Sequence, residues 1–470
     1  MTLDPDDWDA FRASAHAMLD ASIDKLMHAK DGRVWTPLPD TQRDHIRTPL
    51  PIESTPCADI QTQLESFLPY GVGNTHPRFF GWVHGAGAPS GLIAEMAAGA
   101  MNVNAGGRNH IAPIVERQVI NWMAEMIGMP KDTSGLVVSG TSIATIIALK
   151  TARDQALSHT GATLGQLVGY TSEQTHSCVA RAFDMLGLGK DALRIVPCNA
   201  AFEIDLKALE NQIAQDKAEG HLPFLIVGTA GAVNMGAIDD LDGLSHIAKA
   251  HDLWLHIDGA FGATAILSRH ARDRLTGLAK ADSLAFDFHK WLQVNYDAGC
   301  VLIQDEAAHR RAFSDRPEYL RGSERGLAGG AFWAVDYGPE LSRGFRALKV
   351  WAHLKEHGLN RLGAVIDRNI EQAQYLESRI QASPVLDMLA PAPLNICCFR
   401  YKFESGNIDA LNEEIVIQLQ EQGIAVPSTT RIKGQLAIRV NLTNHRTEMK
   451  DLDILVDAVE RIGRELAKVG

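Results

Sequence analysis

The chain has 470 residues, of which 46% are hydrophobic, and its formal net charge at pH 7 is -12. The hydrophobic share is enough for a large buried core, and the length allows about three domains. The negative charge argues against nucleic acid or an anionic membrane as a general partner.

The amino terminus is acidic where a secretory signal would be basic, and no later run is apolar for long enough to span a bilayer. The six cysteines show neither a metal-binding spacing nor a disulfide framework, which favours a reducing compartment. They are Cys57, Cys178, Cys198, Cys300, Cys397 and Cys398. We therefore expect a soluble, cytoplasmic protein.

Apolar residues recur at helical spacing from Trp8 to Leu26, which predicts an amphipathic helix over the first thirty residues. A proline-rich linker is expected from Thr36 to Pro51. Between about residues 90 and 305, helical stretches alternate with short strand-like runs. The runs are 166–169, 193–197, 223–228, 253–257, 283–288 and 299–303. This pattern predicts a largely parallel sheet covered by helices, with ligands at the carboxyl ends of its strands.

The remaining chain predicts a long helix from Leu341 to Ile380 and then a small α+β region. Its elements are strands at 395–401, 424–427 and 435–441, a helix at 409–422 and a closing helix. The expected architecture is α/β in three parts. These are an N-terminal helical segment (1–85), a large α/β domain (86–345) and a small C-terminal α+β domain (346–470).

Two neighbouring strands carry the most informative residues. Asp258 ends one apolar strand and Lys290 follows the next, so both should lie at the same edge of the sheet. Pyridoxal 5'-phosphate (PLP) needs this pair, because a lysine amine forms a Schiff base with its aldehyde and a carboxylate keeps its pyridine nitrogen protonated. The flanking His289 and Trp291 are expected to lower the pKa of the amine. Each residue alone has an ordinary explanation, a solvated lysine or an Asp-Gly turn.

A phosphate site is predicted where the strand-like residues 136–138 run into a helix. Gly140 permits close approach, while Thr141 and Ser142 offer hydroxyls and N–H groups at the helix start. Such residues are more often plain helix caps, so this interpretation depends on Lys290 and Asp258. At another strand-to-helix junction, His176 could stack on a pyridine ring and bind a substrate carboxylate.

These motifs resemble the group II PLP-dependent amino acid decarboxylases, the family of the aromatic amino acid, histidine, glutamate and cysteine sulfinate enzymes. The resemblance runs from about Asn74 to the C-terminus, and the His289-Lys290-Trp291 triplet is its most specific part. It implies a fold type I PLP-dependent transferase architecture. It also implies a homodimer with a shared active site, in which the N-terminal arm lies across the partner subunit.

The resemblance assigns roles to matching positions. It implies that Lys290 forms the Schiff base, that Asp258 binds the ring nitrogen and that His176 stacks on the ring. The phosphate would be held by Gly140, Thr141, Ser142 and His289, with Ala260 packed beneath the ring.

Decarboxylation of an L-amino acid to its amine and carbon dioxide is the reaction this family performs. Arg439 matches the family's arginine near the substrate carboxylate, although an ion pair within its own domain would explain it equally well. Trp82 and Phe80 match the stretch that lines the side-chain pocket and would suit an aromatic substrate, or they belong to the core. An aromatic amino acid is the favoured substrate.

An acidic substrate is the alternative. The segments His76–Phe80 and His110–Pro113 look more like the glutamate branch, in which Arg108 could pair with an acidic side chain. An exposed arginine in a glycine-rich turn needs no such purpose.

The chain departs from the family pattern at Ala232 and Val233, where relatives carry threonines, and at Phe288, where they carry a small residue. The glycine-rich stretch Asp315–Trp333 predicts a mobile lid. The family's lid brings a tyrosine to the reaction centre. Tyr337 is the candidate for that catalytic residue, although a small shift would place Phe332 or Trp333 there instead. Without the phenol, decarboxylation-dependent aldehyde synthesis becomes a competing function.

A different class of enzyme is a further alternative. His353, Glu356 and His357 fit the inverted zinc-peptidase pattern His-x-x-Glu-His, which places two imidazoles on one helix face. Five-residue patterns arise by chance, and a polar helix face that ends at Gly358 explains the same residues. We therefore expect no metal site.

Overall fold

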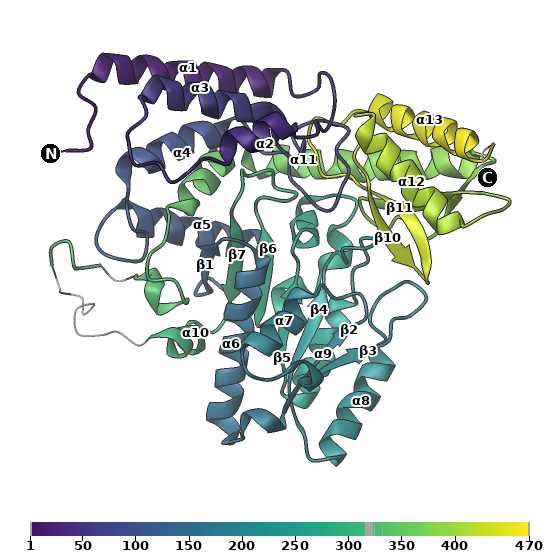
Figure 1. Cartoon of the computed structure of the whole chain (residues 1–470). Coiled ribbons are helices and arrows are strands. Elements are labelled where there is room, and N and C mark those ends of the chain that lie inside the picture. Colours follow the sequence, from purple (N-terminus) through teal and green to yellow (C-terminus); the bar gives the residue numbers. More distant parts are fainter. Residues whose placement is uncertain (1, 315–322, 324, 331, 469–470) are drawn as a thin grey trace. The chain divides into compact units, whose positions relative to one another are not determined.

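The computed structural model describes residues 2–314, 323, 325–330 and 332–468 (Figure 1). Its contacts group the chain into two compact units. Unit 1 comprises residues 1–82, 374–390 and 397–470, and unit 2 comprises residues 83–373 and 391–396. The N-terminal helices and the C-terminal sheet thus fall in one unit. The division into three domains expected from the sequence stays a prediction.

Unit 2 is built on a seven-stranded sheet with the order β1-β7-β6-β5-β4-β2-β3. The strands are β1 (Ser134–Val138), β2 (Leu167–Ser172), β3 (Leu193–Val196), β4 (Leu222–Thr229), β5 (Trp254–Asp258), β6 (Ser283–Asp287) and β7 (Gly299–Ile303). Strands β3, β2, β4, β5 and β6 are parallel, whereas β7 is antiparallel to both β6 and β1. The largely parallel sheet predicted from the sequence is therefore confirmed.

Helices cover both faces of this sheet. The helices of unit 2 are α4 (Ser90–Met101), α5 (Ile111–Ile127), α6 (Thr141–Thr160), α7 (Cys178–Met185), α8 (Leu206–Ala218), α9 (Leu241–His251), α10 (Glu306–Phe313) and most of α11 (Arg346–Ala382). Ile147 of α6 and Phe183 of α7 pack in one buried cluster with Leu136, Leu225 and Val301 of the sheet.

The alternate strand positions face the other helices, because side chains alternate across a sheet. A Cβ on Gly135 would lie 3.1 Å from Ile120 of α5, and one on Gly228 would lie 2.6 Å from Leu244 of α9. These glycines let α5 and α9 approach the sheet closely on its second face.

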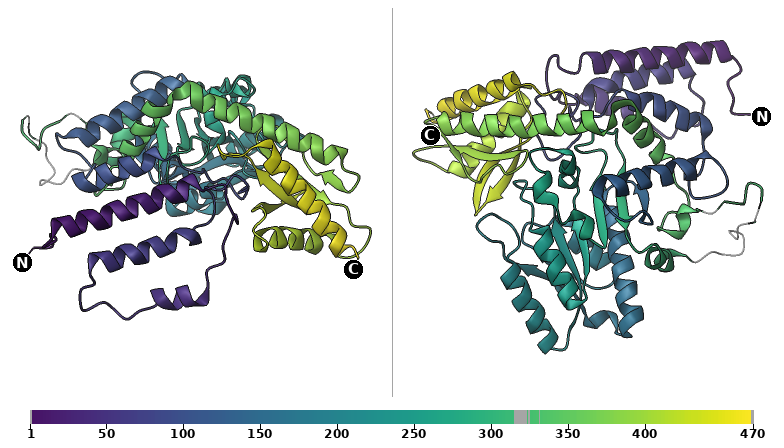
Figure 2. Two further views of the ribbon diagram at one scale, coloured as in Figure 1. Left: turned by 90° about the horizontal axis from the view of Figure 1, so that it is seen from above. Right: turned by 180° about the vertical axis from the view of Figure 1, so that it is seen from behind.

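Unit 1 combines the N-terminal helices with a four-stranded sheet. Its helices are α1 (Trp8–Met27), α2 (Asp40–Ile46), α3 (Cys57–Phe67), α12 (Ile408–Glu421) and α13 (Met449–Leu466), and its strand order is β10-β11-β9-β8. The strands are β8 (Leu386–Met388), β9 (Ile396–Tyr401), β10 (Ser428–Ile432) and β11 (Gln435–Asn441). Helices α1 and α3 run side by side (Figure 2). Phe79 pairs with Val426, which joins the early segment to the C-terminal part.

Three details differ from the sequence-based expectation. The proline-rich linker contains helix α2, which Asp40 in its first turn favours. The strand expected at 424–427 is instead β10, at Ser428–Ile432, where it pairs with β11. The long helix α11 is interrupted at Gly358, whose φ of 65° is not helical. Helix α1 forms as predicted, but none of its residues is buried.

Among the described residues, none of the helices combines the length and the apolar character that a membrane crossing requires.

A glycine of α13 tests the packing of unit 1, and a glycine of α4 in unit 2 serves as its control. A Cβ on Gly463 of α13 would lie 2.3 Å from the ring of Tyr401, whereas one on Gly99 of α4 would meet nothing within 4 Å. Gly463→Ala should destabilise the protein by about 1–3 kcal/mol because the ring must move. Gly99→Ala is the matched control and should stabilise it by about 0.5–1 kcal/mol. Urea unfolding followed by circular dichroism measures both, and equal midpoints would contradict the packing.

Candidate active site

The structure brings the predicted acid and lysine to one edge of the sheet in unit 2. Strands β5 and β6 are parallel neighbours, with Asp258 opposite Ala285. Strand β5 ends at Asp258, and β6 ends at Asp287, three residues before Lys290. The Nζ atom of Lys290 lies 2.9 Å from Oδ2 of Asp287. Asp287 is thus a site residue to which the sequence analysis gave no role, although an acid three residues before the lysine was a readable signal.

The environment of Lys290 differs from the sequence-based expectation. Burial by itself lowers the pKa of Lys290, but the carboxylate of Asp287, helped by Asp258, outweighs burial and raises the pKa above its ordinary value. Trp291 donates its indole N–H to Asn369 at 3.0 Å and is itself almost fully buried. The expected lowering of the pKa by the flanking rings is therefore wrong, because the expectation left out Asp287.

Asp258 is a buried carboxylate whose Oδ1 accepts the N–H of Ala260 at 3.1 Å. Burial raises the pKa of Asp258, and the neighbouring Lys290 amine opposes that effect. The thiol of Cys178 lies 3.8 Å from Oδ2. A carboxylate shielded from water in this way makes strong hydrogen bonds to a cationic N–H group, which is the partner that a protonated pyridine ring offers.

The predicted phosphate loop forms the N-terminus of α6. Gly140 caps this helix without a side-chain bond, and the N–H of Thr141 donates to Oδ1 of Asp287 at 2.7 Å. The hydroxyl of Thr141 is buried and has no hydrogen-bond partner within the part of the chain that the structure describes, while Ser142 is exposed. A buried hydroxyl without a partner is uncommon, and a phosphate oxygen at this helix start would supply the missing bond. The residues present therefore fit PLP.

Gly299 is a second residue that the sequence analysis missed. It opens β7 opposite Asp287, and a Cβ on it would lie 2.6 Å from Cα of Gly140 and 2.7 Å from Oδ1 of Asp287. Only glycine allows β7 to come this close to the phosphate loop. In the sequence, Gly299 only begins a strand-like run, so nothing there indicated its contact with the phosphate loop.

His176 lies after the carboxyl end of β2, where α7 begins. Its Nδ1 accepts the N–H of Cys178 at 3.2 Å, so Nε2 carries the proton of the neutral ring. The side chain is exposed and lies close enough to Asp258 to interact with that carboxylate electrostatically. The ring therefore stands on the sheet edge that also holds Asp258 and Lys290.

His289 belongs to an aromatic cluster beside the lysine. Its ring centroid lies 4.3 Å from that of Tyr296, and the ring of His84 lies 5.7 Å from Tyr296 on another side. Burial lowers the pKa of both imidazoles, which favours their neutral forms. The N–H of Gly85 donates to the carbonyl of His289 at 3.2 Å, so the segment that starts at Val83 lies against the lysine's main chain. His84 and Tyr296 are further site residues that were not predicted from the sequence.

Tyr337 is not brought to this cluster. Its hydroxyl donates to Glu306 at 2.7 Å, and its carbonyl lies 2.7 Å from Nε2 of His309. Burial, then the bond to Glu306, raises the pKa of Tyr337 to about 12. Glu306 and His309 both belong to α10, so both polar groups of Tyr337 are bound by that helix. The catalytic role expected for Tyr337 stays a prediction.

Three further expectations concern other segments. Residues 315–322, 324 and 331 of the expected lid lie outside the described residues. Phe288 is fully buried, with its ring 5.3 Å from that of Phe286. Ala232 is also buried and closes a tight turn by donating its N–H to the carbonyl of Ala237.

The residues expected at the substrate lie together in unit 1. Arg439, on β11, is buried and donates to the carbonyl of Trp82 at 2.8 Å and to Ser428 at 3.2 Å. Burial lowers the pKa of Arg439 to about 10. Trp82 is 51% exposed, whereas Phe80 is only 1% exposed. The partners of Arg439 thus include a carbonyl and a hydroxyl of its own unit, and its role at the substrate carboxylate stays a prediction.

The zinc-peptidase residues lie on α11 just before its interruption. The rings of His353 and His357 are 4.6 Å apart, and Glu356 contacts His357. They do not form a group with closely spaced ligand atoms within the described residues. Asp216, Glu219 and His221 do, with one ligand atom from each within 4.8 Å of the others.

The lysine, the buried acid and the helix N-terminus at the carboxyl edge of a mostly parallel sheet define a PLP-dependent enzyme of fold type I. The family model described as "Pyridoxal-dependent decarboxylase conserved domain" matches residues 39–402. The chain belongs to this decarboxylase family, and it is a PLP-dependent carboxy-lyase that acts on an amino acid. The family resemblance seen in the sequence is confirmed.

Relatives agree with this assignment, and a solved structure shares the fold. The chain is 34% identical over 398 residues to an aromatic-L-amino-acid decarboxylase of Bacillus atrophaeus, covering 83% of this chain and 82% of the relative. It is 28% identical to tryptophan decarboxylase 2 of Oryza sativa subsp. japonica, covering 96% and 94%. The crystal structure of Oryza sativa TDC with PLP and tryptamine superposes with a TM-score of 0.91 at 23% identity, covering 99% of this chain and all of that one.

The pairing of Lys290 with Asp287 can be tested in the protein without cofactor. Asp287→Asn keeps an oxygen for the Thr141 N–H but removes the charge that raises the pKa of Lys290. That pKa should fall by about one unit or more, so a larger fraction of the amine is uncharged at pH 8. Acetic anhydride labelling of the Lys290 peptide against pH, read by mass spectrometry, measures the change. Asp282→Asn, at the opposite end of β6, is the control, and an unchanged labelling midpoint in Asp287→Asn would refute the pairing.

Proposed function

We propose that this enzyme decarboxylates an aromatic L-amino acid to its amine and carbon dioxide. The observation that carries the proposal is the convergence of Lys290, Asp258 and the Thr141 hydroxyl at one sheet edge. PLP, when bound, supplies an electrophilic aldehyde and a π system that accepts the electrons of the broken Cα bond. The residues below are proposed to hold it.

Lys290 is proposed as the covalent attachment point and Asp258 as the partner of the ring nitrogen. Gly140, Thr141, Ser142 and His289 would hold the phosphate, with His176 and Ala260 on the two faces of the ring. Lys290 also keeps a proton in place, because Asp287 stabilises its cationic form. An ammonium group held at this edge would be available as a proton donor.

An aromatic substrate is supported by two independent facts. The relatives with the matching length include aromatic-L-amino-acid, tryptophan and tyrosine decarboxylases. Tyr296, which stacks beside His289, is 47% exposed and so places a partly exposed aromatic residue near the lysine. Trp82, Phe80 and Arg439 stay the proposed contacts of the substrate side chain and carboxylate. A planar side chain would gain apolar burial and ring stacking from such residues.

We also propose a homodimer. Two helices of unit 2 expose apolar pairs one turn apart, Ile93 and Met96 on α4 and Ile111 and Ile114 on α5. Each of these side chains is at least half exposed, and clustered exposure of this kind marks association surfaces. The cytoplasmic location expected from the sequence stays a prediction.

The reaction is tested with the purified, PLP-loaded enzyme and a mixture of L-amino acids. We expect an aromatic amine and carbon dioxide, identified by mass spectrometry, and no activity from Lys290→Ala. Borohydride reduction should label the Lys290 peptide in the wild type. Loss of an acidic amino acid would favour the glutamate-like alternative. An aldehyde with ammonia and hydrogen peroxide, at the expense of oxygen and water, would favour aldehyde synthesis. A peptidase activity that depends on zinc would overturn the proposal.

The dimer is tested by sedimentation equilibrium. The wild type should sediment with twice the mass of the chain, and Ile114→Glu should shift the equilibrium towards the monomer because it buries a charge in the interface. Ile195→Glu, at an equally exposed site on β3, is the control and should leave the mass unchanged. A monomeric wild type would exclude the proposed assembly.

A further inference from the structure

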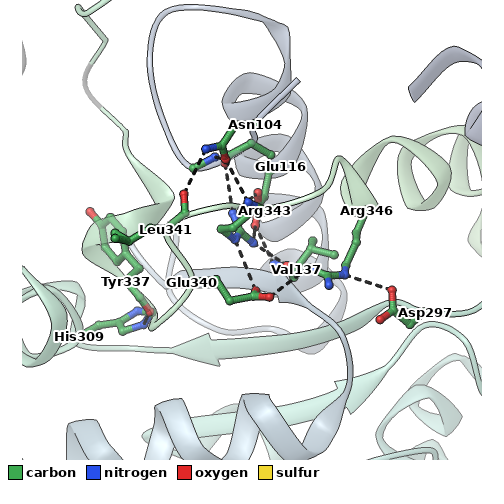
Figure 3. A network of polar contacts seen from close by, with 12 residues as sticks. Asn104, Glu116, Val137, Asp297, His309, Tyr337, Glu340, Leu341, Arg343 and Arg346 are labelled. Atoms are coloured by element: carbon green, nitrogen blue, oxygen red, sulfur yellow. Dashed lines mark hydrogen bonds and ion pairs between the residues drawn. The ribbon is translucent and has the colours of Figure 1, made fainter. Parts of the chain in front are cut away.

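Strand β1 is the outermost strand of the described sheet in unit 2, next to β7. An edge strand presents N–H and C=O groups on its free side, and buried groups of this kind need partners. Val137 finds both partners in side chains (Figure 3). Its N–H donates to Oε1 of Glu116 at 2.8 Å, and its carbonyl accepts from Nη2 of Arg343 at 2.6 Å.

Glu116 and Arg343 form a two-bond ion pair with each other. The Nη1–Oε2 distance is 2.8 Å and the Nη2–Oε1 distance is 2.7 Å. Both side chains are only 2% exposed. The carboxylate accepts and the guanidinium donates, as the C=O and N–H of a neighbouring strand would. The ion pair therefore takes the place of the strand that β1 lacks on this side.

The pair is itself held in position by the main chain around it. Glu116 lies on α5, whose inner face is buried. The N–H of Arg343 donates to Oδ1 of Asn104 at 3.0 Å, and the carbonyl of Arg343 accepts the N–H of Ala105 at 2.8 Å. Asn104 also receives the N–H of Gly106 and donates to the carbonyl of Leu341 (Figure 3). Arg343 thus has little freedom to move relative to β1.

We propose that Glu116 and Arg343 are positioning residues for the cofactor phosphate. Three residues separate Val137 from Thr141, and on the other side of β1 the close approach of Gly299 to Gly140 fixes the same loop. The loop is thereby clamped from both sides before any ligand arrives. The Thr141 hydroxyl and the helix N-terminus are then preorganised, which reduces the cost of binding. This inference rests on the phosphate role proposed for Gly140, Thr141 and Ser142.

The test compares PLP with pyridoxal, which lacks the phosphate. Apo-protein is titrated with each, and binding is followed by quenching of tryptophan fluorescence. Arg343→Gln leaves the Val137 carbonyl without its charged donor and Glu116 without its counter-ion. It should weaken PLP binding about ten-fold or more, the effect of losing one charged hydrogen bond, and leave pyridoxal binding nearly unchanged. Glu116→Gln keeps an acceptor for the Val137 N–H and should give a smaller loss of the same kind.

Arg194→Gln is the matched control, because Arg194 also pairs with a buried carboxylate, Asp216, at 2.9 Å, but on β3. It should change neither affinity. An equal loss of PLP and pyridoxal binding in Arg343→Gln would overturn the inference, as would unchanged PLP binding. If Arg343→Gln does not fold, hydrogen exchange in apo Glu116→Gln decides. Faster exchange of the amides at 136–142 supports the clamp, and unchanged exchange refutes it.

Failure of the underlying phosphate assignment has a different signature. A wild-type protein that binds PLP and pyridoxal equally well would remove the phosphate site itself, whatever the variants do. A wild type that prefers PLP, with variants that keep the preference, would refute the clamp alone.

Discussion

The carboxylate of Asp287 is the contact on which the rest of the site depends. One oxygen receives the first N–H of α6, and the other lies next to the amine of Lys290. The phosphate loop and the lysine are therefore held at a fixed separation by a single side chain at the end of β6. Since the carboxylate is buried, its hydrogen bonds are little weakened by water. If either Asp287 or Lys290 were removed, the other would be left as an unpaired buried charge, which is destabilising.

The reversed strand β7 makes this arrangement possible. Strand β7 lies between β1 and β6. If it were parallel to β6, its first residue would lie at the edge of the sheet away from the site. Because β7 runs antiparallel, its first residue, Gly299, lies at the carboxyl ends of both neighbours. A residue without a side chain at that point lets Gly140 and Asp287 approach each other across the strand. The local exception to the parallel pattern thus positions the site.

Much of this architecture could be predicted from the sequence, and the exceptions have physical causes. Apolar runs that end in Asp258 or before Lys290 reveal a parallel sheet edge, because strand period and chain order determine which ends meet. Contacts that depend on side-chain reach were harder to predict: the spacing of Asp287 and Lys290 was visible, but not that the carboxylate reverses the expected pKa shift of the amine, and nothing indicated that Tyr337 binds Glu306. A tyrosine's place on a loop does not specify the direction in which its ring packs. The helix in the proline-rich segment was missed for a similar reason, since a proline is tolerated just before a helix.

The clamp on β1 shows why an ion pair is buried at a place where apolar residues would pack as well. Pairs such as Glu116–Arg343 add little net stability, because the cost of removing both charges from water roughly cancels their attraction. Apolar side chains, however, have neither a donor nor an acceptor for the free edge of Val137. A neutral amide side chain would offer both a donor and an acceptor. It is shorter than arginine, however, and it lacks the two parallel hydrogen bonds that fix the orientation of the guanidinium. The need to satisfy one peptide unit in a defined direction, beside the cofactor loop, therefore explains the charged pair better than stability does.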